Sequence, residues 1–187
     1  MATSPERFAL FIFCLASLLF AQKSTRSLYF LAGDDGQLCG YSSVKLWNDD
    51  KISLEARLVA RADYENGRLA FVYITELDET GDWTIFDKYS FDKNALLTSL
   101  ERTIDILPGE RREEQLWVIE KGKAVKQKST SRDLATSKIV PRGDVWLPEP
   151  AVVTNTQALP FWPLIRDKRA EILSREKVCM TDQSRAH

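Results

Sequence analysis

An Asn66-Gly67 pair between two strand-like runs is the feature that most constrains the fold. Both residue types accept the positive φ angles that a tight two-residue hairpin turn requires. Before the pair, apolar residues alternate with charged ones over 54–62, and after it the run 69–75 is rich in aromatic and β-branched residues. This pattern predicts that 69–75 folds back onto 58–62 as an antiparallel hairpin.

Further short runs of the same character lie on both sides of this hairpin, and Gly, Asp and Asn residues separate them. Leucine and isoleucine residues at helical spacing in 94–104 predict one short helix. The chain is therefore predicted to be mainly β. The remaining predicted strands cover 28–31, 43–47, 83–86 and 115–119.

The N-terminal segment has the layout of a secretory leader. Its apolar run from Phe8 to Phe20 has 13 residues, fewer than the ~20 that a membrane-spanning helix needs, and ends at the small residue Ala21. We expect residues 1–21 to be a signal peptide that is removed, and the mature chain, without a transmembrane segment, to be secreted and extracellular. The alternative is an uncleaved signal anchor, because Leu19 is large for its position before the cut.

Two cysteines remain once Cys14 leaves with the leader. Secretion exposes Cys39 and Cys179 to an oxidising compartment, where a single disulfide between them can form. Pairing with another chain and two free thiols are the alternatives, and the sequence does not choose among the three.

The composition changes after residue 120. Lys, Ser, Thr and Gln dominate the next twenty residues, which predicts a flexible linker over 121–140 between a domain at 22–120 and a C-terminal extension. The extension, 141–187, is rich in proline and is predicted to be irregular, with a terminal helix over 164–178.

Three blocks in the first half of the chain agree in order and spacing with a known family. They are GQLCG at 36–40, VKLWNDD at 44–50 and NGRL at 66–69. In these blocks, and over 28–91 as a whole, the chain resembles the nematode transthyretin-like proteins. The resemblance implies a secreted antiparallel β-sandwich that binds rather than catalyses. It weakens after residue 120, and the second cysteine that the family usually places in mid-domain is missing.

The chemistry that the residues offer also favours binding. The only histidine is His187, at the end of the chain, which argues against histidine-dependent catalysis and against a zinc site. A net charge of −1 gives no general attraction to nucleic acid. We therefore expect a non-enzymatic protein without cofactor or metal that engages a small apolar ligand or an extracellular protein.

Binding residues in sandwiches tend to lie on the loops. A second candidate is the tripeptide Arg142-Gly143-Asp144, which integrins recognise, although a Gly turn explains the same residues. The predicted binding residues in the loops are Asp34, Asp35, Asn48, Asp49, Asp50, Tyr64 and Asn66.

Three alternatives stay open. Adjacent acids at 34–35, 49–50 and 113–114 would suit a calcium site or a secreted hydrolase that uses carboxylates. A lumenal subunit of a secretory-pathway complex would need cover for an apolar patch. The basic tract at 121–128 would suit anionic lipid or glycosaminoglycan. The patch residues are Trp146, Phe161 and Trp162, and the basic ones are Lys121, Lys123, Lys126 and Lys128.

Overall fold

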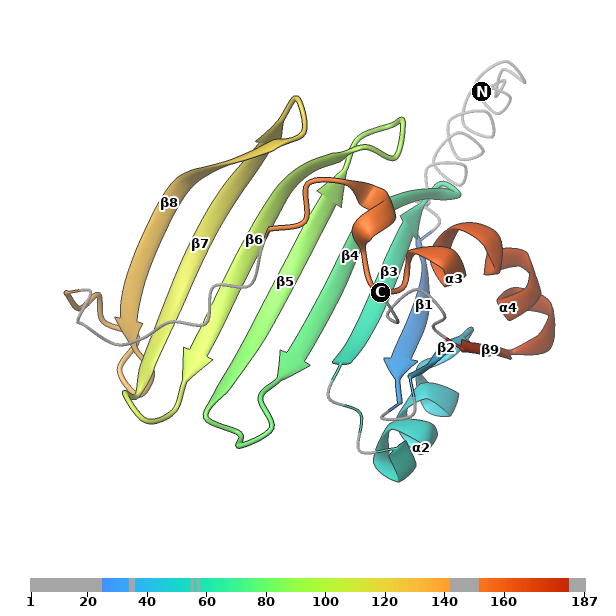
Figure 1. The fold of residues 1–187 in the computed structure, drawn as a ribbon, viewed down its shortest axis with the longest axis horizontal. Coiled ribbons are helices and arrows are strands. Elements are labelled where there is room, and N and C mark those ends of the chain that lie inside the picture. Colours follow the sequence, from blue (N-terminus) through green and yellow to red (C-terminus); the bar gives the residue numbers. More distant parts are fainter. Residues whose placement is uncertain (1–24, 34–35, 55, 57, 142–151, 182–187) are drawn as a thin grey trace, which may run out of the picture.

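A computed structural model describes residues 25–33, 36–54, 56, 58–141 and 152–181. Nine strands in this part of the chain form one antiparallel sheet, in the order β8-β7-β6-β5-β4-β3-β1-β2-β9 (Figure 1). The prediction of a mainly β chain is confirmed, whereas the two-sheet sandwich is not. The strands are β1 (Thr25–Ala32), β2 (Gln37–Tyr41), β3 (Leu58–Glu65), β4 (Arg68–Leu77), β5 (Trp83–Phe91), β6 (Leu97–Ile106), β7 (Arg111–Glu120), β8 (Lys123–Asp133) and β9 (Lys177–Thr181).

The predicted hairpin joins β3 to β4. Asn66 and Gly67 have φ angles of 50° and 78°, as the tight turn requires. The register pairs Leu58 with Glu76 and Ala62 with Val72, so 69–75 does pair back on 58–62. The hairpin starts a meander that continues strand by strand to β8.

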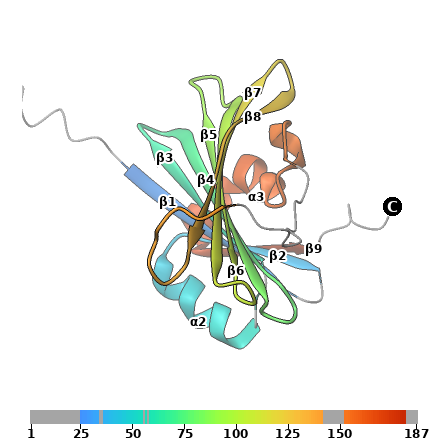
Figure 2. The same cartoon turned by 90° about the vertical axis from the view of Figure 1, so that its left-hand side faces the viewer.

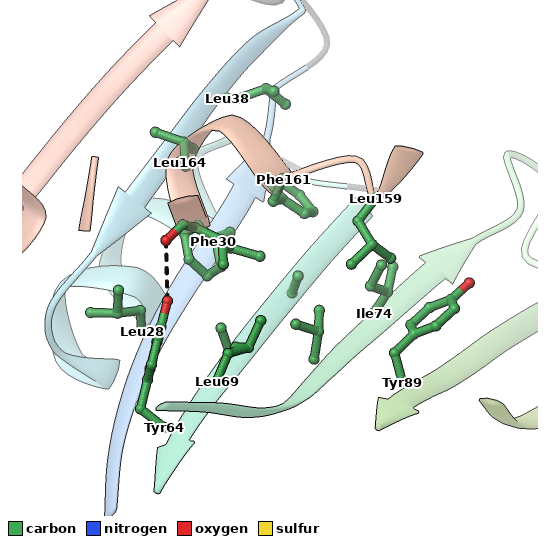
Figure 3. Close-up of a cluster of buried hydrophobic side chains, with 14 of the residues drawn as sticks. Leu28, Phe30, Leu38, Tyr64, Leu69, Ile74, Tyr89, Leu159, Phe161 and Leu164 are labelled. Atoms are coloured by element: carbon green, nitrogen blue, oxygen red, sulfur yellow. Dashed lines mark hydrogen bonds between the residues drawn. The ribbon is translucent and has the colours of Figure 1, made fainter. Parts of the chain in front are cut away.

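A C-terminal segment covers one face of the sheet over β1 to β4. It comprises η1 (Thr156–Ala158), α3 (Trp162–Asp167) and α4 (Arg169–Arg175). In Figure 3 the side chains of Phe161 and Leu164 lie against Phe30, and the Phe30 and Phe161 ring centroids are 5.6 Å apart. All three side chains are at most 1% exposed, so this segment contributes to the main hydrophobic core together with the strands beneath it.

The same segment requires a glycine where it approaches β2. A Cβ atom on Gly40 would lie 2.6 Å from Cδ1 of Ile172 in α4 and 3.3 Å from Cδ1 of Phe30. Only a residue without a side chain allows α4 to pack this closely on the strand.

The opposite face carries α2 (Val44–Leu54) over β1 and β2, and Figure 2 shows α2 and α3 on opposite sides of the sheet. The indole N–H of Trp47 donates to the carbonyl oxygen of Phe30 at 3.0 Å, and its ring lies 5.6 Å from that of Tyr29. Farther along this face, Phe86 and Leu116 are 42% and 36% exposed. An antiparallel sheet tolerates one solvated face.

Two predictions of local structure are wrong. The run 43–47 is not a strand but enters α2, where the Ser43 hydroxyl accepts a hydrogen bond from the N–H of Leu46 at 3.4 Å. The predicted helix over 94–104 is instead strand β6, because β5 pairs with it from Leu97 to Ile106 and β7 pairs with it from Ser99 to Ile106.

The predicted linker over 121–140 is also wrong, since it contains the eleven-residue strand β8. The extension is less irregular than expected. Its predicted terminal helix over 164–178 is two short helices separated at Lys168, and β9 then joins the sheet beside β2.

Candidate functional site

Strand β8 is an edge of the sheet. It pairs with β7 on one side, and on its outer side only its last residues have partners in the described part of the chain. There the N–H of Asp133 donates to the carbonyl of Lys138, and the N–H of Val140 donates to the carbonyl of Ser131, each at 3.0 Å. No described strand covers the outer side of 123–130. Those residues present their outward N–H and C=O groups as a template for another extended chain.

The side chains of this edge are basic. Lys123 and Lys128 are exposed, and Lys126 holds its ammonium group 4.5 Å from the centroid of the Trp117 ring. From residue 123 to Arg132 the sequence has no acidic residue. Across the pairing with β7, Lys123 lies opposite Glu120, so part of this positive charge has an acidic neighbour.

Charges elsewhere on the open face are paired across neighbouring strands. Lys88 lies 2.7 Å from Glu101, and the guanidinium of Arg112 holds both carboxylate oxygens of Asp105 at 2.6 and 2.7 Å. The exposed face of β5 to β7 thus carries matched charges.

A buried polar cluster lies on the opposite, inner side of the same strands. The guanidinium of Arg102 donates to both carboxylate oxygens of Asp87, at 2.8 and 2.7 Å. These residues are 3% and 8% exposed. The hydroxyl of Tyr89 donates to Asp87 at 3.2 Å, and burial, followed by the charge of Asp87, raises the pKa of this phenol.

Glu113 extends this cluster toward the edge. Its side chain is 1% exposed, and neither carboxylate oxygen has a hydrogen-bond partner among the described residues, nor has the hydroxyl of Ser131 opposite it on β8. In the sequence Glu113 and Glu114 are adjacent acids at the end of a mixed-charge run. In strand β7 successive side chains point to opposite faces, so Glu114 instead accepts from Arg132 at 2.9 Å on the open face.

The structure separates the predicted loop residues. Asn48, Asp49 and Asp50 belong to helix α2, not to a loop. Asp49 pairs with Lys45 at 2.8 Å, and Asp50 pairs with Lys177 at 2.5 Å. These are surface ion pairs at the α2 end of the sheet.

The other predicted residues lie at the β3–β4 hairpin or outside the described residues. Tyr64 is 3% exposed and belongs to the core, where its hydroxyl donates to the carbonyl of Ile165 at 3.3 Å (Figure 3). Asn66 borders a hollow of about 400 Å³ that extends to Lys93. Because α2 and this hairpin lie at opposite ends of the strands, the structure brings together no single loop site (Figure 1). Outside the described residues lie Asp34, Asp35, Arg142, Gly143 and Asp144.

Of the three alternatives for the two cysteines, the structure shows the disulfide between them. Cys39 and Cys179 are direct cross-strand partners in β2 and β9, with their Cα atoms 4.1 Å apart. The proposed exposed patch is wrong in one of its members, since Phe161 is 1% exposed in the core, while Trp146 lies outside the described residues.

Sequence reasoning missed both the edge and the buried cluster. Positive φ angles at Lys121 and Gly122, 52° and 75°, form a turn like that at Asn66-Gly67, and this dipeptide was the available signal for β8. Alternation in 100–106 was the signal for the burial of Arg102.

Within the described residues, no helix is both long and apolar enough to cross a membrane, and no group of three or more His, Cys, Asp or Glu side chains is placed to hold a metal ion. No family model, curated protein or solved structure matches the chain.

Proposed function

We propose that the chain is a secreted, non-enzymatic binding module that holds an extracellular protein partner by adding the partner's extended segment to strand β8. The observation that carries this proposal is that no described strand covers the outer side of 123–130 in β8, which is one of the two edge strands of the sheet, the other being the five-residue β9. Strand addition at such an edge provides affinity through main-chain hydrogen bonds.

The surroundings of the edge support a protein partner over a small apolar ligand. The hollow beside Asn66 has charged walls, among them Glu65, Arg68 and Asp92, which suit an apolar molecule poorly. The exposed side chains of Leu116 and Val125, 36% and 44% exposed, instead lie on the open face next to the edge. An added strand would cover part of this apolar surface.

Two further observations support the extracellular setting. The Cys39–Cys179 bridge is of the kind that persists in oxidising compartments, and the segment 1–21 has the layout of a cleaved leader. Kinship with transthyretin-like proteins is a separate proposal that rests on the three sequence blocks. One of these, at 44–50, lies in a helix rather than in a strand.

A matched pair of proline variants tests the proposal. Consecutive N–H groups of a strand point to opposite sides, so one of Ala124→Pro and Val125→Pro removes an outward N–H and the other removes a hydrogen bond to β7. The variant that has lost only an outward N–H is called the outward variant. It is identified as the one whose melting temperature stays close to that of the wild type.

Affinity capture from the extracellular fluid of the source then compares this outward variant with the wild-type chain. We expect the variant to lose the partner that the wild type retains. Undiminished capture of the same partner by the outward variant would refute binding at the edge.

A further inference from the structure

We propose that β9 is a strand that reduction releases: a dithiol opens the Cys39–Cys179 bridge, and β9 then leaves the sheet and uncovers the outer side of β2. In the described part of the chain β9 pairs only with β2, over the five cross-strand pairs that join 37–41 to 177–181 (Figure 1). It lies at the opposite edge of the sheet from β8, so its release does not depend on binding at β8.

Few side chains of β9 are buried. Val178 is 9% exposed in the main core and Met180 packs against that core, while the other three residues of the strand are exposed. Lys177 pairs with Asp50 at 2.5 Å, but an ion pair between partly exposed side chains contributes little to stability. Apart from its backbone pairing with β2, the strand therefore depends on the bridge and on the burial of Val178.

The residue that joins α4 to β9 has a strained backbone. Glu176 has a φ of 68° and a ψ of −35°, outside the left-handed helical region, where ψ is positive, and residues other than glycine rarely adopt these angles. Such a conformation persists only where the structure on both sides holds it. Release of β9 would let Glu176 return to a negative φ, so the strain at this hinge favours release.

The structure before the hinge stays in place when β9 leaves. Ile172 of α4 is fully buried, and its Cδ1 atom lies against Gly40 of β2. The N–H of Ser42 also donates to the carbonyl oxygen of Glu176 at 2.9 Å, which anchors the end of α4 beside β2. Release is therefore confined to the residues after Glu176, and the outward N–H and C=O groups of β2 become a second open edge.

The two sulfur atoms of the bridge differ in their surroundings. Cys39 is 2% exposed in a hydrophobic cluster beside α2, whereas Cys179 is exposed on the edge strand. A thiolate from solvent therefore meets Cys179 first.

The exchange reaction then has a defined direction. The thiolate of the dithiol bonds to Sγ of Cys179, the bond between the two cysteines breaks, and Cys39 leaves as a thiolate that takes a proton from water. The second thiol of the reductant attacks its own sulfur in the mixed disulfide and frees Cys179. The bridge gains two electrons, and the dithiol loses two as it becomes a cyclic disulfide.

Hydrogen–deuterium exchange of the chain without residues 1–21 tests the release. The probe is dithiothreitol in native buffer, and exchange is followed by mass spectrometry in β9 and, as a reference, in β4 to β6. We expect reduction to remove the protection of the β9 amides and to leave the reference strands protected. With a monothiol in place of dithiothreitol, the trapped mixed disulfide should lie on Cys179.

Two sets of variants supply the controls. The Cys39→Ser, Cys179→Ser variant should show unprotected β9 amides with and without dithiothreitol. Glu176→Gly removes the strain at the hinge, whereas Glu176→Ala keeps a Cβ atom and with it the strain. In the reduced state the glycine variant should therefore exchange the β9 amides several-fold more slowly than the alanine variant.

Three results would overturn the proposal. The β9 amides could keep their full protection after reduction, which would mean that the backbone ladder alone holds the strand. Protection could be lost in β4 to β6 as well, which would make the bridge a support of the whole sheet. Dithiothreitol could also reduce the bridge only when urea unfolds the chain. Equal exchange in the two Glu176 variants would remove the hinge strain from the mechanism.

Discussion

Removing the Cys39–Cys179 bridge should lower the free energy of unfolding by about 3 to 5 kcal/mol. The bridge joins residues 140 positions apart. Treated as a constraint on the unfolded chain, a loop of this length corresponds to about 5 kcal/mol at 25 °C. The lower limit reflects residual structure in the reduced unfolded chain, which makes measured losses smaller than this value.

The assay is urea unfolding of the chain without residues 1–21, followed by tryptophan fluorescence. The Cys39→Ser, Cys179→Ser variant should show a lower midpoint than the wild type, and thermal melting should fall by roughly 6 to 12 °C for a loss of about 3 kcal/mol. Wild-type protein reduced with dithiothreitol serves as the control and should match the variant. A change below about 1 kcal/mol in both samples would refute the reasoning, because loop closure over this length would then contribute almost nothing.

Three other perturbations have defined outcomes. Asp87→Leu should cost about 3 to 5 kcal/mol by stranding the buried Arg102 guanidinium, while adding Arg102→Leu should restore most of the loss, as measured by urea unfolding. Gly40→Ala should cost about 1 to 3 kcal/mol in the same assay, and adding Ile172→Val, which removes the Cδ1 atom lying 2.6 Å from the new Cβ, should recover part of it. Burial raises the pKa of Tyr64 from 10.0 to about 12, so folding keeps the phenol protonated, and this stabilisation should disappear as the pH rises from 10 to 12.

Each of these has a result that would contradict it. A double Asp87, Arg102 variant no more stable than the Asp87 single variant would mean that the guanidinium was not the source of the loss. Equal losses for Gly40→Ala with and without Ile172→Val would exclude that contact. For Tyr64, the Phe variant should lose less stability between pH 10 and 12 than the wild type, and identical pH profiles would remove the phenol as the cause.

The sequence by itself determined the features that depend on a few neighbouring residues. The turn at Asn66-Gly67 follows from the positive φ angles that these residues tolerate, and the strands beside it follow from alternation along 58–65. The sequence also left three alternatives for the bonding of Cys39 and Cys179. Choosing the bridge required β9 to lie beside β2, a contact between distant parts of the chain.

In two segments, β6 and the run 43–47, the residue pattern alone did not distinguish a helix from a strand. Leu97, Leu100 and Ile104 fit helical spacing, but this segment forms strand β6 because strands on both sides of it supply hydrogen bonds. In this strand Leu100 and Ile104 point to the buried face. The run 43–47 has strand-forming residues but no strand partner, and Ser43 begins a helix instead.

Only the tertiary structure decided which residues form an edge. The residues 121–138 have the composition of a linker, since few of them are large and apolar. Residues 123–133 form β8 because the backbone N–H and C=O groups of β7 pair with theirs. Backbone hydrogen bonds of this kind depend little on the composition of the side chains. Likewise, the burial of Glu113 and Arg102 depends on the face to which each strand position turns and on what covers that face. Local sequence sets the turns and the alternation, whereas strand order sets which backbone groups remain open to a partner.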